Sequence, residues 1–93
     1  MFSNAWRGLV SGLIYPIQFE RDPIEGVDRV LEIVVGRHAM GATREDFAAA
    51  VDAALSSGES LAKLIPQPHS EAVIRAYLAE LQKRLANEPP PTS

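Results

Sequence analysis

The chain has 93 residues, of which 46% are hydrophobic, and this is the length and composition of one small globular domain. It contains no cysteine, which excludes disulfide frameworks and thiolate metal sites and is typical of a reducing cytoplasm. The net charge of −3 is the opposite of the basic footprint that nucleic-acid-binding domains carry, so we expect no nucleic-acid partner.

The longest run without a charged residue extends from Gly8 to Phe19 and has twelve members. A membrane-spanning helix needs about 20 apolar residues, and this run also contains Ser, Gln and Pro. We therefore expect no membrane span, no signal peptide and a cytoplasmic location.

Apolar side chains recur at intervals of three and four within residues 2–15, which favours a short helix capped by Ser3 or Asn4. Gly8 and Gly12 disfavour that helix, because each costs up to about 1 kcal/mol relative to alanine. Both a helical and an extended conformation therefore remain open for this segment.

The alternation of apolar and polar residues from Tyr15 to Arg21 predicts an extended segment. No second convincing strand is present to pair with it, so it either lies across the helices or offers a free edge to another chain. We expect Trp6, Tyr15 and Phe19 to contact the helices or a second chain, because aromatic side chains gain much from burial.

A strong helix start follows, with Asp22 as the N-cap and Pro23 at the first helical position. The predicted helix ends at Gly36, or else continues to Met40 with Gly41 as a left-handed cap.

The next helix is predicted to begin at Thr43, whose side chain forms a capping box with Asp46. It should end at Gly58. Ser60 is then expected to cap a short helix over residues 61–65.

The last helix is predicted over residues 70–86, with Ser70 as its N-cap and one continuous apolar stripe. Three consecutive prolines beyond it end the helix. Two ion pairs one turn apart should form on its exposed side, namely Glu71 with Arg75 and Glu80 with Arg84.

These elements predict an all-α fold, a small bundle of three main helices and one short helix in a single domain. Residues 1–21 are assigned to an N-terminal arm, 22–87 to the helical core and 88–93 to a proline-rich tail. The predicted core residues are Ile24, Val27, Leu31, Val34, Phe47, Val51, Leu55, Leu61, Leu64, Ile74, Leu78, Leu81 and Leu85.

No catalytic or cofactor-binding motif is recognisable in the sequence. His38 and His69 are the only histidines and lack metal-ligand spacing, so we expect no metal, no cofactor and no enzymatic activity. Residues 47–65 have the outline of a helix-turn-helix, but the second helix carries a single lysine, Lys63, and is better explained by core packing.

A cluster of acidic residues is the strongest surface feature. Between residues 20 and 32 there are five acids against two arginines, which gives this stretch a charge of −3. Such a face can attract a basic protein partner, although the alternative interpretation is an ordinary solvated helix surface. The candidate partner-binding residues are Glu20, Asp22, Glu25, Asp28 and Glu32.

Two stretches carry a family resemblance. Tyr15–Asp22 is rich in aromatic residues and ends on an aspartate before a helix, and residues 47–85 contain a helix, a Leu-Ser-Ser-Gly break, a short helix and a closing Tyr-Leu-x-x-Leu-x-x-x-Leu helix. Together they resemble the helical immunity proteins of bacterial contact-dependent growth inhibition systems. The resemblance implies a small non-enzymatic protein, an immunity protein or antitoxin, that neutralises a co-encoded toxin domain, often a nuclease with a basic cleft.

The alternative hypothesis is a self-associating helical adaptor or structural domain. In that case the partner is a second copy of the chain, and a homodimer forms through the N-terminal arm.

Overall fold

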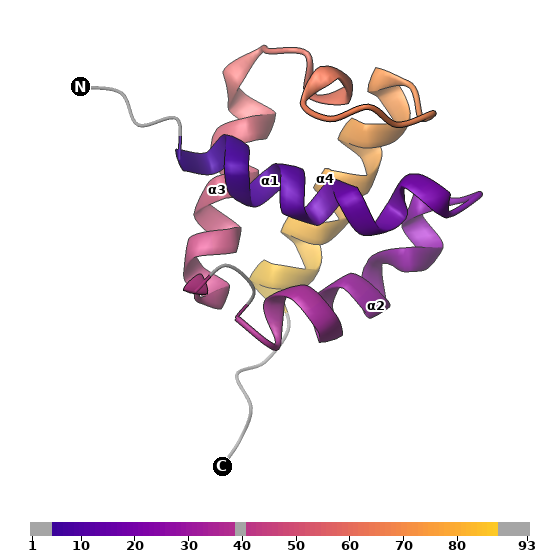
Figure 1. Cartoon of the computed structure of the whole chain (residues 1–93). Helices are drawn as coiled ribbons and strands as arrows, with labels where there is room; N and C mark the ends of the chain where they lie inside the picture. The colour runs from indigo at the N-terminus through magenta and orange to yellow at the C-terminus, as the bar shows by residue number, and fades with distance from the viewer. Residues whose placement is uncertain (1–4, 39–40, 88–93) are drawn as a thin grey trace.

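The computed structural model describes residues 5–38 and 41–87. Over these residues the chain is a bundle of helices without a strand, so the predicted all-α class is confirmed (Figure 1). The tail at 88–93, the caps at Ser3 and Asn4, Phe2 and the helix end at Met40 lie outside the described residues. The elements are α1 (Ala5–Ile14), the 3-10 helices η1 (Tyr15–Phe19) and η2 (Pro23–Gly26), α2 (Val27–Val30), the π-helical η3 (Leu31–Val35), α3 (Arg44–Ser57), the 3-10 helix η5 (Leu61–Lys63) and α4 (Glu71–Asn87).

The N-terminal segment is helical and belongs to the core. Helix α1 crosses the bundle in front of α4 and lies against α3, with which it makes the most extensive contact of any pair of elements (Figure 1). Val10 and Leu13 are fully buried, and Trp6 packs at the edge of the core. The apolar spacing therefore outweighs the two glycines, because the helix buries its apolar stripe against the rest of the bundle.

The extended segment expected at residues 15–21 is wrong, because Tyr15–Phe19 winds as a 3-10 helix. In an extended strand, Tyr15, Ile17 and Phe19 would all face the same side. A 3-10 helix has three residues per turn, so Ile14 and Ile17 share the inner face and their neighbours turn outward. Ile17 is accordingly buried, whereas Tyr15 and Phe19 are exposed.

The single helix expected after Asp22 is instead a succession of 3-10, α and π turns. Asp22 accepts a hydrogen bond from the Ile24 N–H as predicted, at 3.0 Å. The π turn ends where the Gly36 N–H donates to the Leu31 carbonyl at 2.7 Å. The tight first turn rotates Ile24 away from the core, so its predicted burial is wrong, and its side chain is 38% exposed.

The predicted ends of α3 are confirmed. Thr43 and Asp46 form the capping box, with hydrogen bonds in both directions, and Gly58 ends the helix with φ at +75°, a conformation that favours glycine. Ser60 does not cap η5 with its side chain, so that expectation is wrong.

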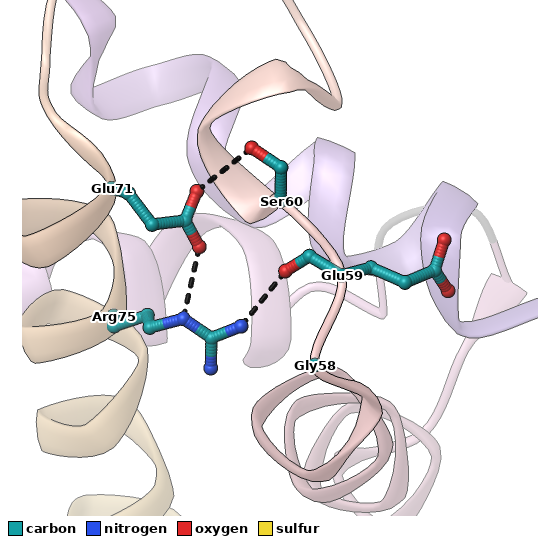
Figure 2. A pocket seen from close by; sticks show the side chains of 5 residues that line it. All are labelled: Gly58, Glu59, Ser60, Glu71 and Arg75. Carbon is teal, nitrogen blue, oxygen red and sulfur yellow. Dashed lines mark hydrogen bonds and ion pairs between the residues drawn. The ribbon is translucent and has the colours of Figure 1, made fainter.

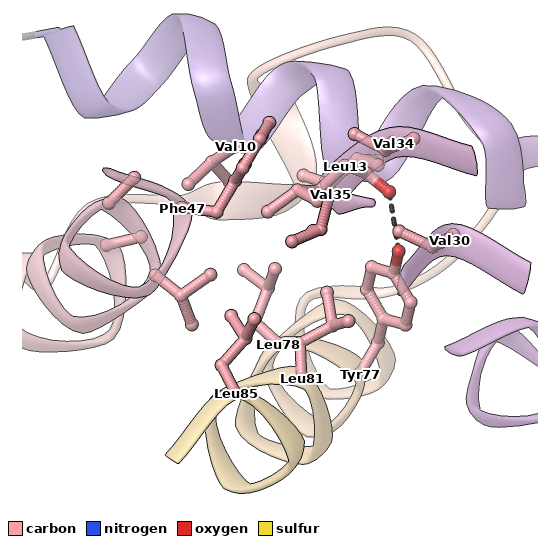
Figure 3. Packing of buried hydrophobic residues seen from close by; sticks show 14 of the residues in the cluster. Val10, Leu13, Val30, Val34, Val35, Phe47, Tyr77, Leu78, Leu81 and Leu85 are labelled. Atoms are coloured by element: carbon pink, nitrogen blue, oxygen red, sulfur yellow. Dashed lines mark hydrogen bonds between the residues drawn. The ribbon is translucent and has the colours of Figure 1, made fainter. Parts of the chain in front are cut away.

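Helix α4 provides one wall of the core. Tyr77, Leu78, Leu81 and Leu85 face α1, α3 and the α2–η3 segment across the interior (Figure 3). Ser70 caps the helix through the Val73 N–H at 3.3 Å, as predicted. Of the remaining predicted core residues, Leu31, Leu55 and Leu64 are half-buried at the edge and the others are buried.

A buried polar contact joins α4 to α1. The Tyr77 hydroxyl donates to the Leu13 carbonyl at 2.6 Å, and both residues are fully buried (Figure 3). Burial raises the pKa of Tyr77 far above its ordinary value, which keeps the hydroxyl protonated and able to donate.

Replacing Leu81 by alanine should lower the free energy of unfolding by about 2–5 kcal/mol, because a fully buried leucine leaves a cavity when it is truncated. Urea unfolding of both proteins measures the difference. A loss below about 1 kcal/mol would contradict the central position that we assign to α4.

Tyr77→Phe should lower the free energy of unfolding by about 1–3 kcal/mol, because it leaves the buried Leu13 carbonyl without its donor while preserving the ring. Tyr15→Phe is the matched control, since this exposed hydroxyl makes no such contact and its loss should stay within about 0.5 kcal/mol. Equal stabilities for the two variants would show that the hydrogen bond is not a stabilising constraint.

Candidate functional site

The five predicted partner-binding acids follow the path of the chain from the end of η1 through η3. Glu20 ends η1, Asp22 caps η2, Glu25 lies in η2, Asp28 in α2 and Glu32 in η3. All except half-buried Glu20 are exposed. The structure thus places them along one continuous stretch of backbone at the molecular surface.

Three of these acids are already engaged inside the molecule. The Asp22 carboxylate caps η2, and Asp28 forms an ion pair with Arg84 of α4. A looser pair joins Glu20 to Arg29 at 3.8 Å. The Asp28 side chain is 80% exposed, so its ion pair contributes little to stability.

Glu25 and Glu32 have no hydrogen-bond or ion-pair partner among the residues that the structure describes. In a regular α-helix, Glu25, Asp28 and Glu32 would share a face, because they are three and four residues apart. The mixed winding changes that register, because 3-10, α and π turns contain different numbers of residues. Glu25 and Glu32 are therefore the two exposed carboxylates of the cluster that remain available to a partner.

A second polar cluster lines a shallow hollow between α4 and the loop after α3 (Figure 2). Glu71 accepts hydrogen bonds from the Ser60 hydroxyl at 3.1 Å and from the N–H groups of Leu61 and Ala62 at 3.0 and 2.9 Å. The carboxylate of Glu71 thereby caps η5, the role that the sequence had assigned to Ser60.

Arg75 completes this cluster. It donates to Glu71 at 2.9 Å, which confirms the predicted pair, and to the Glu59 carbonyl at 2.8 Å (Figure 2). A longer bond of 3.4 Å reaches the Leu55 carbonyl at the end of α3. These polar groups therefore bond to one another, and their hydrogen bonds connect α3, η5 and α4.

The charge of Glu71 reflects these contacts. Burial raises the pKa of its carboxyl group, but the backbone donors of Ala62 and Leu61, the Ser60 hydroxyl and Arg75 favour the charged form and together lower the pKa below its ordinary value. The pairing with Arg75 follows from the i,i+4 spacing, whereas the backbone donors of Leu61 and Ala62 come close to Glu71 only when the chain folds.

The two histidines do not form a site together. His69 is half-buried and its Nε2 lies 2.9 Å from the Ile17 carbonyl, while His38 is exposed with φ at +54°. Within residues 5–38 and 41–87, no group of three or more His, Cys, Asp or Glu side chains could hold a metal ion.

Sequence reasoning missed the exposure of two aromatic side chains on η1. Tyr15 is 64% exposed and Phe19 is 87% exposed, in contrast to Trp6, which packs against the core. Pro16 was the signal that could have indicated this, because it favours a turn over a paired strand. Contact of Tyr15 and Phe19 with a second chain stays a prediction.

Comparison of the chain with protein-family models, with curated proteins and with solved structures gives no match. In the part of the chain that the structure describes, no helix combines the length and the apolar character needed to cross a membrane.

Glu71→Gln should reduce stability most at neutral pH, by about 1 kcal/mol, because the amide keeps one acceptor oxygen but loses the second acceptor and the charge that hold Leu61, Ala62 and Arg75. A carboxyl group whose pKa is lowered by folding stabilises the protein above its ordinary pKa of 4.5, and this contribution is lost as the pH falls through the folded-state value. The difference in free energy of unfolding between the two proteins should therefore shrink on acidification.

Urea unfolding at a series of pH values measures this difference, with Glu32→Gln as the control, because Glu32 is exposed and has no hydrogen-bond or ion-pair partner among the described residues. A gap between wild type and Glu71→Gln that does not change with pH would contradict the role of the charged carboxylate in capping η5.

Proposed function

We propose that this protein is a small non-enzymatic protein-interaction domain that binds a basic protein through its acidic face, defined by Glu20, Asp22, Glu25, Asp28 and Glu32. The observation that carries the proposal is the exposure of Glu25 and Glu32 and their lack of internal partners among the described residues. Both are exposed and without a partner in the described structure, in a stretch whose net charge is −3.

Charges of this kind act mainly on the encounter between two proteins. Exposed carboxylates attract a basic surface from a distance of about one Debye length, roughly 8 Å at physiological salt, and are screened by ions at longer range. They therefore raise the association rate more than they tighten the final complex. The ion pairs of Asp28 and Glu20 are weak enough to exchange their arginine for a cation of the partner.

The resemblance to immunity proteins gives this proposal a specific form. The partner is then a toxin domain encoded beside this chain, with a basic cleft that the acidic face covers, and the protein acts in the bacterial cytoplasm. The support is the aromatic-rich entry Tyr15–Asp22 and the order of helix, Leu-Ser-Ser-Gly break, short helix and closing helix over residues 47–85.

The second candidate is self-association through the N-terminal segment. It is favoured by one observation, the exposure of Tyr15 and Phe19 on η1. Size-exclusion chromatography with the product of the neighbouring gene separates the two candidates, because a co-eluting heterocomplex supports the first and a homodimer alone supports the second.

The double variant Glu25→Gln with Glu32→Gln should associate more slowly with that gene product, by about tenfold at low salt, and its rate should depend less on salt. Stopped-flow mixing at several salt concentrations measures both effects. The fold should be preserved, because neither carboxylate makes an internal contact in the described structure.

The matched control is Glu45→Gln with Asp52→Asn, which removes the same charge from the exposed side of α3. Asp52→Asn keeps the oxygen that accepts from Gln82. If both double variants slow association equally, the effect is due to net charge alone and the acidic face is not the binding site.

A further inference from the structure

Tyr15 and Phe19 project from η1 into solvent although the chain has a core that accepts aromatic side chains. Phe47 and Tyr77 are fully buried in that core, whereas Tyr15 and Phe19 are 64% and 87% exposed. Single exposed apolar residues are common on protein surfaces, but two aromatic rings on one five-residue turn are a concentration of apolar surface.

The turn that carries these rings is firmly held. Ile17 is buried between them in the sequence, and its carbonyl accepts from the Glu20 N–H at 3.0 Å and lies 2.9 Å from His69 Nε2. The Gln18 side-chain amide donates to the Tyr15 carbonyl at 3.1 Å. The backbone that presents Tyr15 and Phe19 is therefore fixed before any partner arrives.

Close packing from the other side adds to this rigidity. A methyl group placed on Gly26 would lie 3.3 Å from the Cγ2 atom of Ile17, which is tighter than ordinary van der Waals contact. Helix η2 therefore lies directly against the inner side of η1. A rigid support of this kind reduces the entropy lost on binding, and aromatic anchors on rigid supports dominate the energy of many interfaces.

The charged residues that follow the two rings in the sequence indicate what kind of surface the rings meet. Between Tyr15 and Gly26 there are three acids, Glu20, Asp22 and Glu25, against one arginine, Arg21, which gives a net charge of −2. In a symmetric homodimer through this turn the same acids of both copies would face each other and repel. A basic surface is attracted instead.

We infer that Tyr15 and Phe19 are the apolar anchors of the interface, and that each inserts into its own apolar pocket, bordered by lysine or arginine, on a different protein. This inference rests on the proposed function. The η1 turn forms the centre of the interface, and the acidic face forms its rim. The rings supply the binding energy, and Glu25 and Glu32 supply the orientation and the rate.

Selection of random peptides displayed on phage against the full-length protein tests this inference without knowledge of the natural partner. The selected peptides should combine basic with aromatic or aliphatic residues. Their dissociation constants should rise by about 30-fold for Phe19→Ser, as expected for the loss of a binding hot spot, and should be restored by Phe19→Trp. Circular dichroism should give the same melting temperature for all variants, because Phe19 is outside the core.

The outcomes separate the inference from the function on which it rests. Basic peptides that depend on Glu25 and Glu32 but not on Phe19 would overturn the aromatic anchors and leave the acidic face in place. Peptides that depend on Phe19 but carry no basic residues would overturn the basic rim. Failure to select any peptide, or a homodimer in solution that Phe19→Ser dissociates, would overturn the inference in full.

Discussion

The hydrogen bond from the Tyr77 hydroxyl to the Leu13 carbonyl joins α4 to the end of α1, at the point where the N-terminal segment passes from α1 into η1. In a 3-10 turn, the Leu13 carbonyl would accept from the N–H of residue 16, but Pro16 has no N–H. The change from α1 to η1 therefore leaves a buried acceptor that needs a donor from elsewhere. Tyr77 provides it from α4 and fixes the point at which the chain turns outward. The position of η1, and with it the presentation of Tyr15 and Phe19, depends on this contact between residues far apart in the sequence.

Local signals predicted those parts of the fold that short-range physics determines. The capping box of Thr43 and Asp46, the left-handed end at Gly58 and the cap at Ser70 are contacts within a few residues, and all are present. The conformation of residues 2–15 could not be decided in this way, because the glycines disfavour a helix locally and only burial in the core, mainly against α3, compensates for them.

The candidate site was predictable in composition but not in detail. The sequence identified the acidic stretch, yet the partner of Asp28 is Arg84 and lies 56 residues further along the chain. The capping of η5 by Glu71 is likewise a contact between elements, and no local pattern indicates it. The spacing of Glu25 and Glu32 depended on α-helical winding, which the π turn of η3 interrupts. Tertiary packing determines both the long-range partners and whether a turn is 3-10, α or π. Local sequence patterns therefore predict neither of them.

The same dependence on winding explains why the surface has its apolar anchors where it does. A strand through residues 15–19 would have placed Tyr15, Ile17 and Phe19 together on one side, and all three would then be buried or exposed as a group. The 3-10 turn separates them, so Ile17 holds the backbone to the core while the rings remain free. Gly26 of η2 packs against the Ile17 side chain and His69 contacts the Ile17 carbonyl, and both contacts restrain that backbone. Within η1, Ile17 thus contributes to stability, and Tyr15 and Phe19 are left for binding. A substitution at Phe19 can therefore change recognition without changing the fold.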